Sequence, residues 1–300
     1  MSLRWINAAF RRVNLEAAPE FLFLPQRIGR PFDPSLAPGQ FRLSASPGPG
    51  RVYQRAERFH FSSTDLAAFN LHVGPMSSVS VTGTDATVYS LDVLAEITTD
   101  EEAQGSALLE RLALHRDGGT LRLKTPPYLE HVKSHTYVDV VAPAGRAVVI
   151  TGAYTAVELL NINGPVTVST THGRIHLIDL TARIDASARE GGSIIFAGSG
   201  GHVHLSADLG IDVRISQQNY AGVFEATARG PVRVRLPHRF ASGFEANVHS
   251  RAEFVCRVEL GSPLRFRRDH GRIAVHHGSE DPPRMRLTSL EGPVVIDQSS

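Results

Sequence analysis

A short phrase built around glycine recurs through the second half of the chain and limits what the chain can fold into. The phrase is Gly, any residue, Val or Ile, any residue, and then an apolar residue. Its seven copies begin at Gly164, Gly173, Gly192, Gly201, Gly230, Gly271 and Gly292. Apolar side chains at every second position are the period of a β-strand with one buried face. The sequence therefore predicts many short strands, each preceded by a turn at glycine.

The spacing of the phrase indicates how the strands are arranged. Early copies lie 9 or 19 residues apart, which makes one strand and one turn the unit. Gly145, Gly173, Gly201 and Gly230 follow at intervals of 28, 28 and 29 residues, or three units each. We therefore expect a parallel β-solenoid, a β-helix with three sides, whose rungs stack about 4.8 Å apart. A two-sided coil with a rung of 19 residues also matches the step from Gly173 to Gly192 and remains open.

Alternation within the strands predicts which side chains fill the interior. Seven apolar residues on one face should be buried. They are Ile175, Leu177, Ile194, Val203, Leu205, Val232 and Val234. The residues between them, Arg174, His176, His202 and His204 among them, should point outwards.

The N-terminal extension, residues 1–55, has a different character. Residues 1–17 show the spacing of a short amphipathic helix, and seven prolines between residues 19 and 49 indicate an extended connector. We expect this extension to pack on the sheet, because the end of a solenoid leaves strand edges and core uncovered. The chain thus divides into an extension over residues 1–55 and an all-β domain over residues 56–300.

One further helix interrupts the strands. Thr99 and Glu102 have the spacing of a capping box, and Leu108, Leu112 and Leu114 follow at helical intervals. The helix should end before the sequence Asp-Gly-Gly at residues 117–119, which predicts a hairpin turn.

Composition excludes several classes of protein. The 31 basic and 30 acidic residues give a net charge of +1, which argues against a dedicated nucleic-acid-binding protein. Cys256 is the single cysteine, so neither a disulfide framework nor a cysteine zinc site is expected. The sequence has no 18-residue apolar run and no signal-peptide pattern at its start. It predicts a cytoplasmic protein without a membrane span, or a cell-envelope protein if the true start lies upstream.

Motifs for chemistry are scarce. The sequence has no P-loop, His-Glu-x-x-His, Cys-x-x-Cys or Gly-x-Ser-x-Gly, and we expect no cofactor. His202 and His204 share a strand face, and the three-sided register would place His176 one rung below His204. These three are weak candidates for metal ligands, because exposed strand histidines are more often simply solvated.

Arginine gathers in the last quarter of the chain. Residues 229–286 contain 12 arginines and six acidic residues. Alternation places several of these arginines on outer strand faces, where they could bind an anionic polymer or an acidic protein partner. The candidate residues are Arg233, Arg235, Arg265, Arg267, Arg268 and Arg272.

The chain resembles the putative adhesin domain family of bacterial envelope-associated proteins. The resemblance rests on "APAGRAVVITG", on "INGPVTVSTTHGRIHLIDLTARIDASAREGGSI" and on the closing "MRLTSLEGPVVID". It spans roughly residues 60–297 and implies a right-handed β-helix with a largely undefined function. The family has no established catalytic residues that could be assigned to this chain.

Two functions from different classes follow. The first is a non-enzymatic binding or scaffold module, and the alternative is a carbohydrate-active hydrolase or lyase on a β-helix. The alternative needs aromatic platforms for sugar rings, and the chain offers one tryptophan and six tyrosines. The sequence therefore favours the binding module and leaves its ligand and oligomeric state open.

Overall fold

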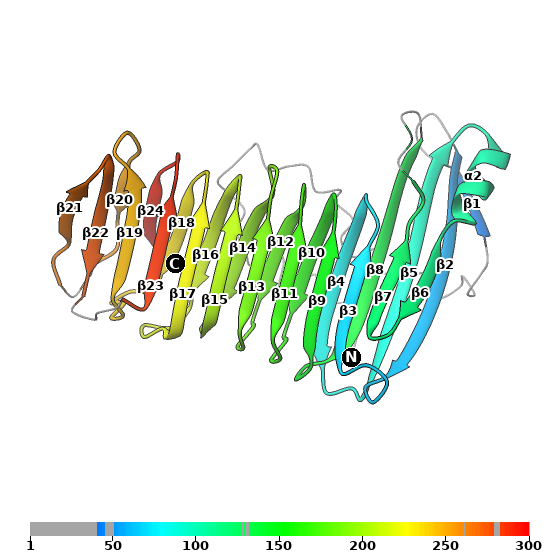
Figure 1. Ribbon diagram of the computed structural model, residues 1–300, viewed down its shortest axis with the longest axis horizontal. Coiled ribbons are helices and arrows are strands. Elements are labelled where there is room, and N and C mark those ends of the chain that lie inside the picture. Colours follow the sequence, from blue (N-terminus) through cyan, green and yellow to red (C-terminus); the bar gives the residue numbers. More distant parts are fainter. Residues whose placement is uncertain are drawn as a thin grey trace.

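Figure 1 shows the computed structural model, an elongated molecule whose strands form two β-sheets. The structure describes residues 41–45, 51–127, 129, 132–260, 262–278 and 283–299, the first segment and residue 269 by backbone alone. The predicted helix over residues 1–17 and most of the proline-rich extension lie outside the described residues. Strand β2 (Arg51–Ser62) runs across the predicted domain boundary between residues 55 and 56.

The first sheet has twelve described strands, antiparallel among β1, β2, β5 and β8 and parallel from there on. In order across the sheet they are β1 (Phe41–Ala45), β2, β5 (Val88–Thr99), β8 (Lys133–Pro143), β4 (Ser77–Thr84), β10 (Thr155–Leu160), β12 (Arg174–Ile178), β14 (Ser193–Gly198), β16 (Gly210–Ile215), β18 (Val232–Leu236), β24 (Val294–Gln298) and β20 (Phe254–Cys256).

The second sheet also has twelve described strands, parallel through its middle and antiparallel at both ends. In order they are β21 (Arg265–Asp269), β22 (Arg272–His277), β19 (Phe244–His249), β23 (Met285–Ser289), β17 (Ala221–Ala228), β15 (Gly200–Ala207), β13 (Ile184–Ala188), β11 (Val166–Thr170), β9 (Ala147–Gly152), β3 (Ala68–Val73), β7 (Thr120–Lys124) and β6 (Ala113–Asp117).

Between β9 and β18 the chain passes back and forth between the two sheets, one strand at a time. In the first sheet Val157 pairs with Ile175, and Ile175 pairs with Ile194. The predicted three-sided coil is therefore wrong, and the repeat contains one strand in each sheet. The 28-residue interval suggested three sides, but it spans one and a half repeats. Gly145, Gly173, Gly201 and Gly230 therefore lie at the starts of strands that alternate between the two sheets.

Glycine allows successive repeats to approach each other closely. A Cβ atom at Gly173 would collide with the carbonyl oxygen of Thr155, and one at Gly230 with the carbonyl oxygen of Leu209. Both carbonyls belong to the backbone of the preceding repeat, so the glycines are required by the stacking distance.

The predicted core is confirmed. All seven residues expected inside are at most 3% exposed, and they belong to one apolar cluster between the sheets. Their burial follows from the alternation in each strand, which turns every second side chain away from solvent. The unit of one strand and one turn was thus predicted correctly, although the number of sides was not.

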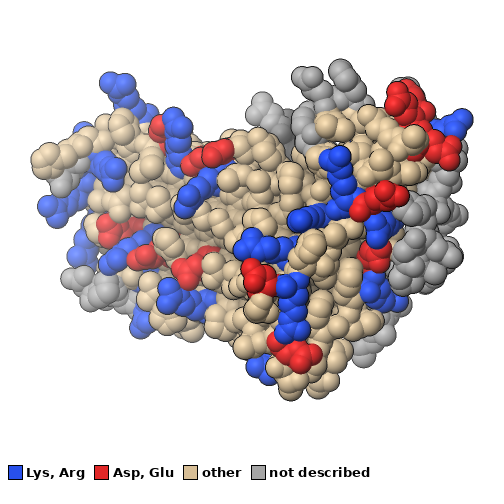
Figure 2. All heavy atoms as spheres, turned by 45° about the vertical axis from the view of Figure 1, so that its right-hand side comes forward, with Lys and Arg blue, Asp and Glu red and all other residues tan. Residues whose placement is uncertain are grey.

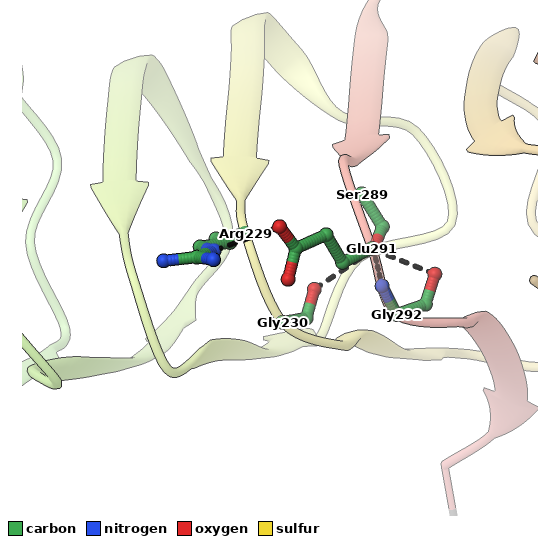
Figure 3. A network of polar contacts seen from close by, with 5 residues as sticks. All are labelled: Arg229, Gly230, Ser289, Glu291 and Gly292. Carbon is green, nitrogen blue, oxygen red and sulfur yellow. Dashed lines mark hydrogen bonds and ion pairs between the residues drawn. The ribbon is translucent and has the colours of Figure 1, made fainter.

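The last two strands are inserted between earlier ones. In Figure 1, β24 (red) lies between β18 and β20, and β23 lies in the same way between β17 and β19. Figure 3 shows the turn that holds this insertion. Ser289 Oγ donates to the carbonyls of Gly230 (2.8 Å) and Gly292 (2.7 Å), and Arg229 Nε donates to Glu291 Oε1 (2.9 Å).

The copy of the phrase at Gly271 does not join the parallel stack. It precedes β22, which pairs antiparallel with both β19 and β21.

The second predicted helix is confirmed as α2 (Glu102–Leu109) but is shorter than expected, and Leu114 lies in β6. The capping box is absent, because Thr99 Oγ1 donates to Gln104 Oε1 and the helix begins without a side-chain cap. The hairpin at residues 117–119 is confirmed.

Among the described residues, no helix is long and apolar enough to cross a membrane.

Candidate functional site

Parallel pairing in register places side chains from successive strands in rows on the outer faces of the sheets. Neighbours within a row are separated by one strand spacing, about 4.8 Å. Two such rows cross the outer face of the second sheet, and a third crosses the outer face of the first sheet.

The charge row lies on the outer face of the second sheet. Its members, one from each of five adjacent strands, are Asp185, His204, Glu225, Arg286 and Glu245. His204 Nδ1 lies 3.8 Å from Asp185 Oδ1, and Arg286 Nη1 donates to Glu225 Oε1 at 3.1 Å. Such half-exposed pairs contribute little to stability, so their regular spacing across strands matters more as a surface pattern than as a fold determinant.

The hydroxyl row runs beside the charge row, two residues further along each strand. Its members are Ser169, Ser187, Ser206, Thr227 and Thr288. Thr151 extends it at one end and shares a 2.9 Å hydrogen bond with His72 Nδ1. None of the five hydroxyls forms a side-chain hydrogen bond with another described residue, and each side chain is half-buried. They are therefore available to an external donor or acceptor.

The buried polar row crosses the outer face of the first sheet. Its members are Asp92, Asp139, Ser80, Glu158 and His176. Glu158 is 3% exposed and His176 is 8% exposed, although both lie on the face opposite the apolar core. Glu158 Oε1 and His176 Nε2 have no hydrogen-bond partner among the described residues. Polar atoms buried without a hydrogen-bond partner cost free energy, so Glu158 and His176 are expected to reduce the stability of the fold.

Burial changes the protonation of this row. It raises the pKa of Glu158 from 4.5 to about 7, and the nearby Asp139 raises that pKa further. Burial also raises the pKa of Asp139 to about 6, with a further contribution from Asp92. The pKa of His176 falls to about 4, first through burial and then through Arg174. Asp139 and Glu158 therefore keep their protons up to nearly neutral pH, while His176 stays uncharged.

An exposed aromatic pair lies where the chain turns between the sheets. Tyr154 is 50% exposed and stacks on His172, with ring centroids 4.2 Å apart and planes 4° apart. His172 Nε2 also lies 3.4 Å from Glu190 Oε2. Three other tyrosines, Tyr53, Tyr89 and Tyr220, are buried. One exposed ring offers a small surface for a sugar, far less than an extended aromatic platform.

The candidate arginines fall into two groups in different sheets. Arg233 and Arg235 are exposed on β18 of the first sheet, where Arg233 pairs with Asp212 of β16. Burial raises the pKa of Asp212, and Arg233 and Arg235 oppose that rise, so this carboxyl partly balances both arginines. Internal charge compensation thus exists at β18.

The remaining candidate arginines lie at the far edge of the second sheet. Arg265, Arg267 and Arg268 belong to its terminal strand β21, and Arg272 begins the neighbouring β22. Strands β18 and β21 are not neighbours, so the two groups do not form one surface. On the face shown in Figure 2, Lys and Arg are interspersed with Asp and Glu, and neither sign of charge dominates. Anion binding by these residues stays a prediction.

The three candidate histidines do not come together. His176 lies in β12 of the first sheet, beside Glu158 and Ile195, whereas His202 and His204 lie in β15 of the second sheet. The register that placed His176 below His204 assumed three sides and is wrong. Among the described residues, no three His, Cys, Asp or Glu side chains are grouped closely enough to hold a metal ion.

Sequence reasoning missed the hydroxyl row and the buried polar row. The hydroxyl row has a signal, because Ser or Thr follows the second apolar residue in strands such as "VTVST", "IDASA" and "FEATA". Glu158 has a weaker signal, a single acid within the apolar run "TAVELL". Its burial could not be predicted, because it depends on what covers an outer sheet face and not on alternation within the strand.

No protein-family model matches the sequence, and comparison with curated proteins gives no match. Among solved structures, a putative cell adhesion protein from Clostridium sporogenes is 10% identical, with a TM-score of 0.37, and the match covers 82% of this chain and 100% of that one. A putative adhesin from Parabacteroides merdae is 9% identical with a TM-score of 0.36, covering 80% and 95% of the two chains. A putative adhesin from Parabacteroides distasonis is 12% identical with a TM-score of 0.35, covering 81% and 97%.

Proposed function

We propose that this chain is a non-enzymatic binding module, a two-sided right-handed β-solenoid that binds an extended ligand along the outer face of its second sheet. The observation that carries the proposal is the hydroxyl row, which runs beside the charge row across neighbouring strands. A surface of this kind repeats one chemical group at a fixed interval of about 4.8 Å.

A repeating surface suits a repeating ligand. Each hydroxyl both donates and accepts hydrogen bonds, and a polysaccharide presents hydroxyls along its whole length. Single contacts of this type are weak, but contacts repeated along one chain combine because each bound unit raises the effective concentration of the next. The charge row adds acidic and basic side chains beside the hydroxyls and would favour a polar polymer over an apolar one.

The test is binding to soluble polysaccharides by affinity electrophoresis, with a neutral dextran and an acidic alginate as probes. The variant Ser187→Ala/Ser206→Ala/Thr227→Val removes three adjacent hydroxyls and keeps the backbone. Thr82→Val, on the outer face of the first sheet, is the matched control. We expect retardation of the wild type and of the control on at least one probe, and loss of retardation in the triple variant.

Equal retardation of the triple variant and the wild type, or none in the wild type on either probe, would overturn the proposal. The enzymatic alternative is tested in the same samples by measuring new reducing ends after incubation. Release of sugar by the wild type would replace the binding module with a carbohydrate-active enzyme, for which the exposed pair of Tyr154 and His172 would be the first region to vary.

A further inference from the structure

Strand β21 is the terminal strand of the second sheet among the described strands, and one of its edges has no described neighbour. It pairs with β22 on one side, and no described strand lies on the other side. Its unpaired N–H and C=O groups are a template on which another extended chain can pair. Natural edge strands are often protected by short length or by charge, so the side chains of β21 decide what can bind there.

An exposed phenylalanine marks this edge. Phe266 is 64% exposed, the most exposed large apolar side chain among those described. It pairs across the strands with Val275, which is fully buried, so the Phe266 ring lies on the core side of the sheet. Its ring partner is Phe254 of β20, at a centroid distance of 6.2 Å and nearly perpendicular. The core therefore continues to this end of the molecule and leaves an aromatic surface uncovered.

The same strand is strongly basic. Arg265 and Arg267 alternate with Phe266 and lie on the outer face, with His276 opposite Arg265. Arg268 lies on the face of Phe266, and Arg272 follows at the start of β22. None of the four arginines forms an ion pair with a side chain that the structure describes. In contrast, the two arginines of β18 have Asp212 beside them.

We infer that the free edge of β21 binds an extended acidic segment of a partner protein by strand addition. The backbone of the segment pairs with β21, its acidic side chains meet Arg265 and Arg267 on one face, and an apolar side chain packs on Phe266 on the other face. Alternation in the bound strand is required, because successive side chains point to opposite faces. This surface is separate from the hydroxyl row and does not depend on the proposed function.

The charges argue against the other possible occupants. A second copy of β21 in parallel register would place each arginine opposite its own copy, and an antiparallel pair centred on Arg267 would place Arg267 opposite Arg267. Like charges directly opposite one another destabilise a pair of strands. A polysaccharide or nucleic acid would satisfy the arginines but would leave the strand edge unpaired and Phe266 exposed. An acidic peptide with alternating apolar residues satisfies all three features.

The experiment measures fluorescence anisotropy of a short labelled peptide in which Glu alternates with Val around one central Phe. We expect saturable binding to the full chain that weakens at least tenfold in Arg267→Glu and in Phe266→Ser. Binding should also weaken as the salt concentration rises, because the arginine–carboxylate contacts are exposed to counterions. Arg189→Glu, an exposed charge reversal on the turn after β13, is the matched control and should bind as the wild type does.

A second peptide, N-methylated at alternate backbone positions on the edge that would pair, separates strand addition from simple charge attraction. The proposal predicts that it binds at least tenfold more weakly than the first peptide. Equal binding of the two peptides, unchanged binding in either β21 variant, or no binding to the wild type would each overturn the proposal. The triple hydroxyl variant should bind the peptide normally, so failure of the proposed function would not affect this result. Circular dichroism of each variant verifies that it is folded.

Discussion

The repeated middle of the molecule and its N-terminal part contribute to the same two sheets and the same apolar core, but their strands differ in length and direction. From β9 to β18, short parallel strands of five to eight residues stack in register, each on the corresponding strand of the preceding repeat. In the N-terminal part, β2, β5 and β8 are antiparallel strands of 12, 12 and 11 residues. In the middle, glycines at several turns, Gly173 and Gly230 among them, allow successive repeats to approach closely, whereas the N-terminal part has long strands paired along their whole length.

Sequence and strand register are related differently in the two regions. In the middle, the same short pattern recurs, so a strand paired out of register would still place apolar residues beside similar apolar residues. Only the turns then distinguish the correct register from the shifted one. In the N-terminal part no pattern recurs, and a slip of one residue would reverse the faces of every side chain in a long strand such as β5. Substitutions at turns should therefore matter more in the middle, and substitutions on strand faces should matter in both regions.

The largest expected effect is that of a buried charge in the middle. Leu205→Asp places a carboxylate among fully buried apolar side chains and should cost several kcal/mol, enough to unfold the molecule. Because the apolar cluster includes both regions, Val93→Asp in the N-terminal part should unfold it as well. Thermal unfolding followed by circular dichroism measures both. Two separate transitions, with only one of them lost in each variant, would show that the regions are independent.

Turn glycines should provide the next largest effect. Gly173→Ala forces a Cβ atom against the Thr155 carbonyl of the preceding repeat and should cost roughly 1–3 kcal/mol. Gly145→Ala is the matched control, because a Cβ atom there meets nothing within 4 Å. Urea denaturation gives both free energies of unfolding. Equal values for the two variants would mean that glycine sets the register of the middle region no more than the strands do.

The buried polar row, which begins in the N-terminal part and ends in the middle, should make stability depend on pH. The folded pKa of Glu158 is above its ordinary value, so the folded state holds the proton more tightly and stability falls as pH rises from 4.5 to about 7. Glu158→Gln removes this loss and should gain about 3 kcal/mol relative to wild type on going from pH 4.5 to pH 8. Urea denaturation at several pH values measures the gain.

His176 acts in the opposite direction over a lower range. Its folded pKa is below its ordinary value, so its contribution is present above pH 6.5 and is lost as pH falls towards 4. The pH profile of Glu158→Gln should therefore retain a decrease on the acid side. Parallel stability profiles for the variant and the wild type across this range would show that Glu158 titrates normally in the folded protein.

The smallest expected effect concerns the inserted last repeat. Ser289 Oγ donates to two glycine carbonyls and accepts from the Gly292 N–H group at 3.0 Å. Ser289→Ala should cost about 1–2 kcal/mol, because it leaves these backbone groups with one partner fewer in a half-buried turn. Arg229→Ala, which removes an exposed ion pair in the same network, should cost less than about 1 kcal/mol. A chemical denaturation curve for each variant tests the order.

Much of the fold could be predicted from local patterns. Alternation around Ile175, Val203 and Val232 predicted the core correctly because it depends only on the direction of successive side chains. The number of sides could not be predicted, because the spacing of the glycines is compatible with a coil of either two or three sheets. The C-terminal order was also hidden, since Val294 pairs with Val232 although β19 to β23 lie between them in the chain.

The candidate sites were harder to predict for a related reason. The arginines were identified as exposed from alternation, but whether β18 and β21 are neighbours depends on the order of strands in the sheets. The hydroxyl row needs the register between strands as well as the sequence within each one. The burial of Glu158 depends on what covers the outer face of the sheet, and the sequence of its own strand contains no signal for that.

The position of β23 and β24 between earlier strands sets a time order on folding. Residues are synthesised from the N-terminus, so β19 and β20 leave the ribosome before the strands that they rest against. Until residues 285–298 have emerged, β17 and β18 present open edges. Strands β19, β22 and β21 pair with one another but have no link to β17, and β20 has no partner in the first sheet. Residues 244–277 can therefore join the two sheets only after β23 and β24 have emerged, and a chain truncated before residue 285 would expose the unpaired edges of β17, β18, β19 and β20 to chaperones and proteases.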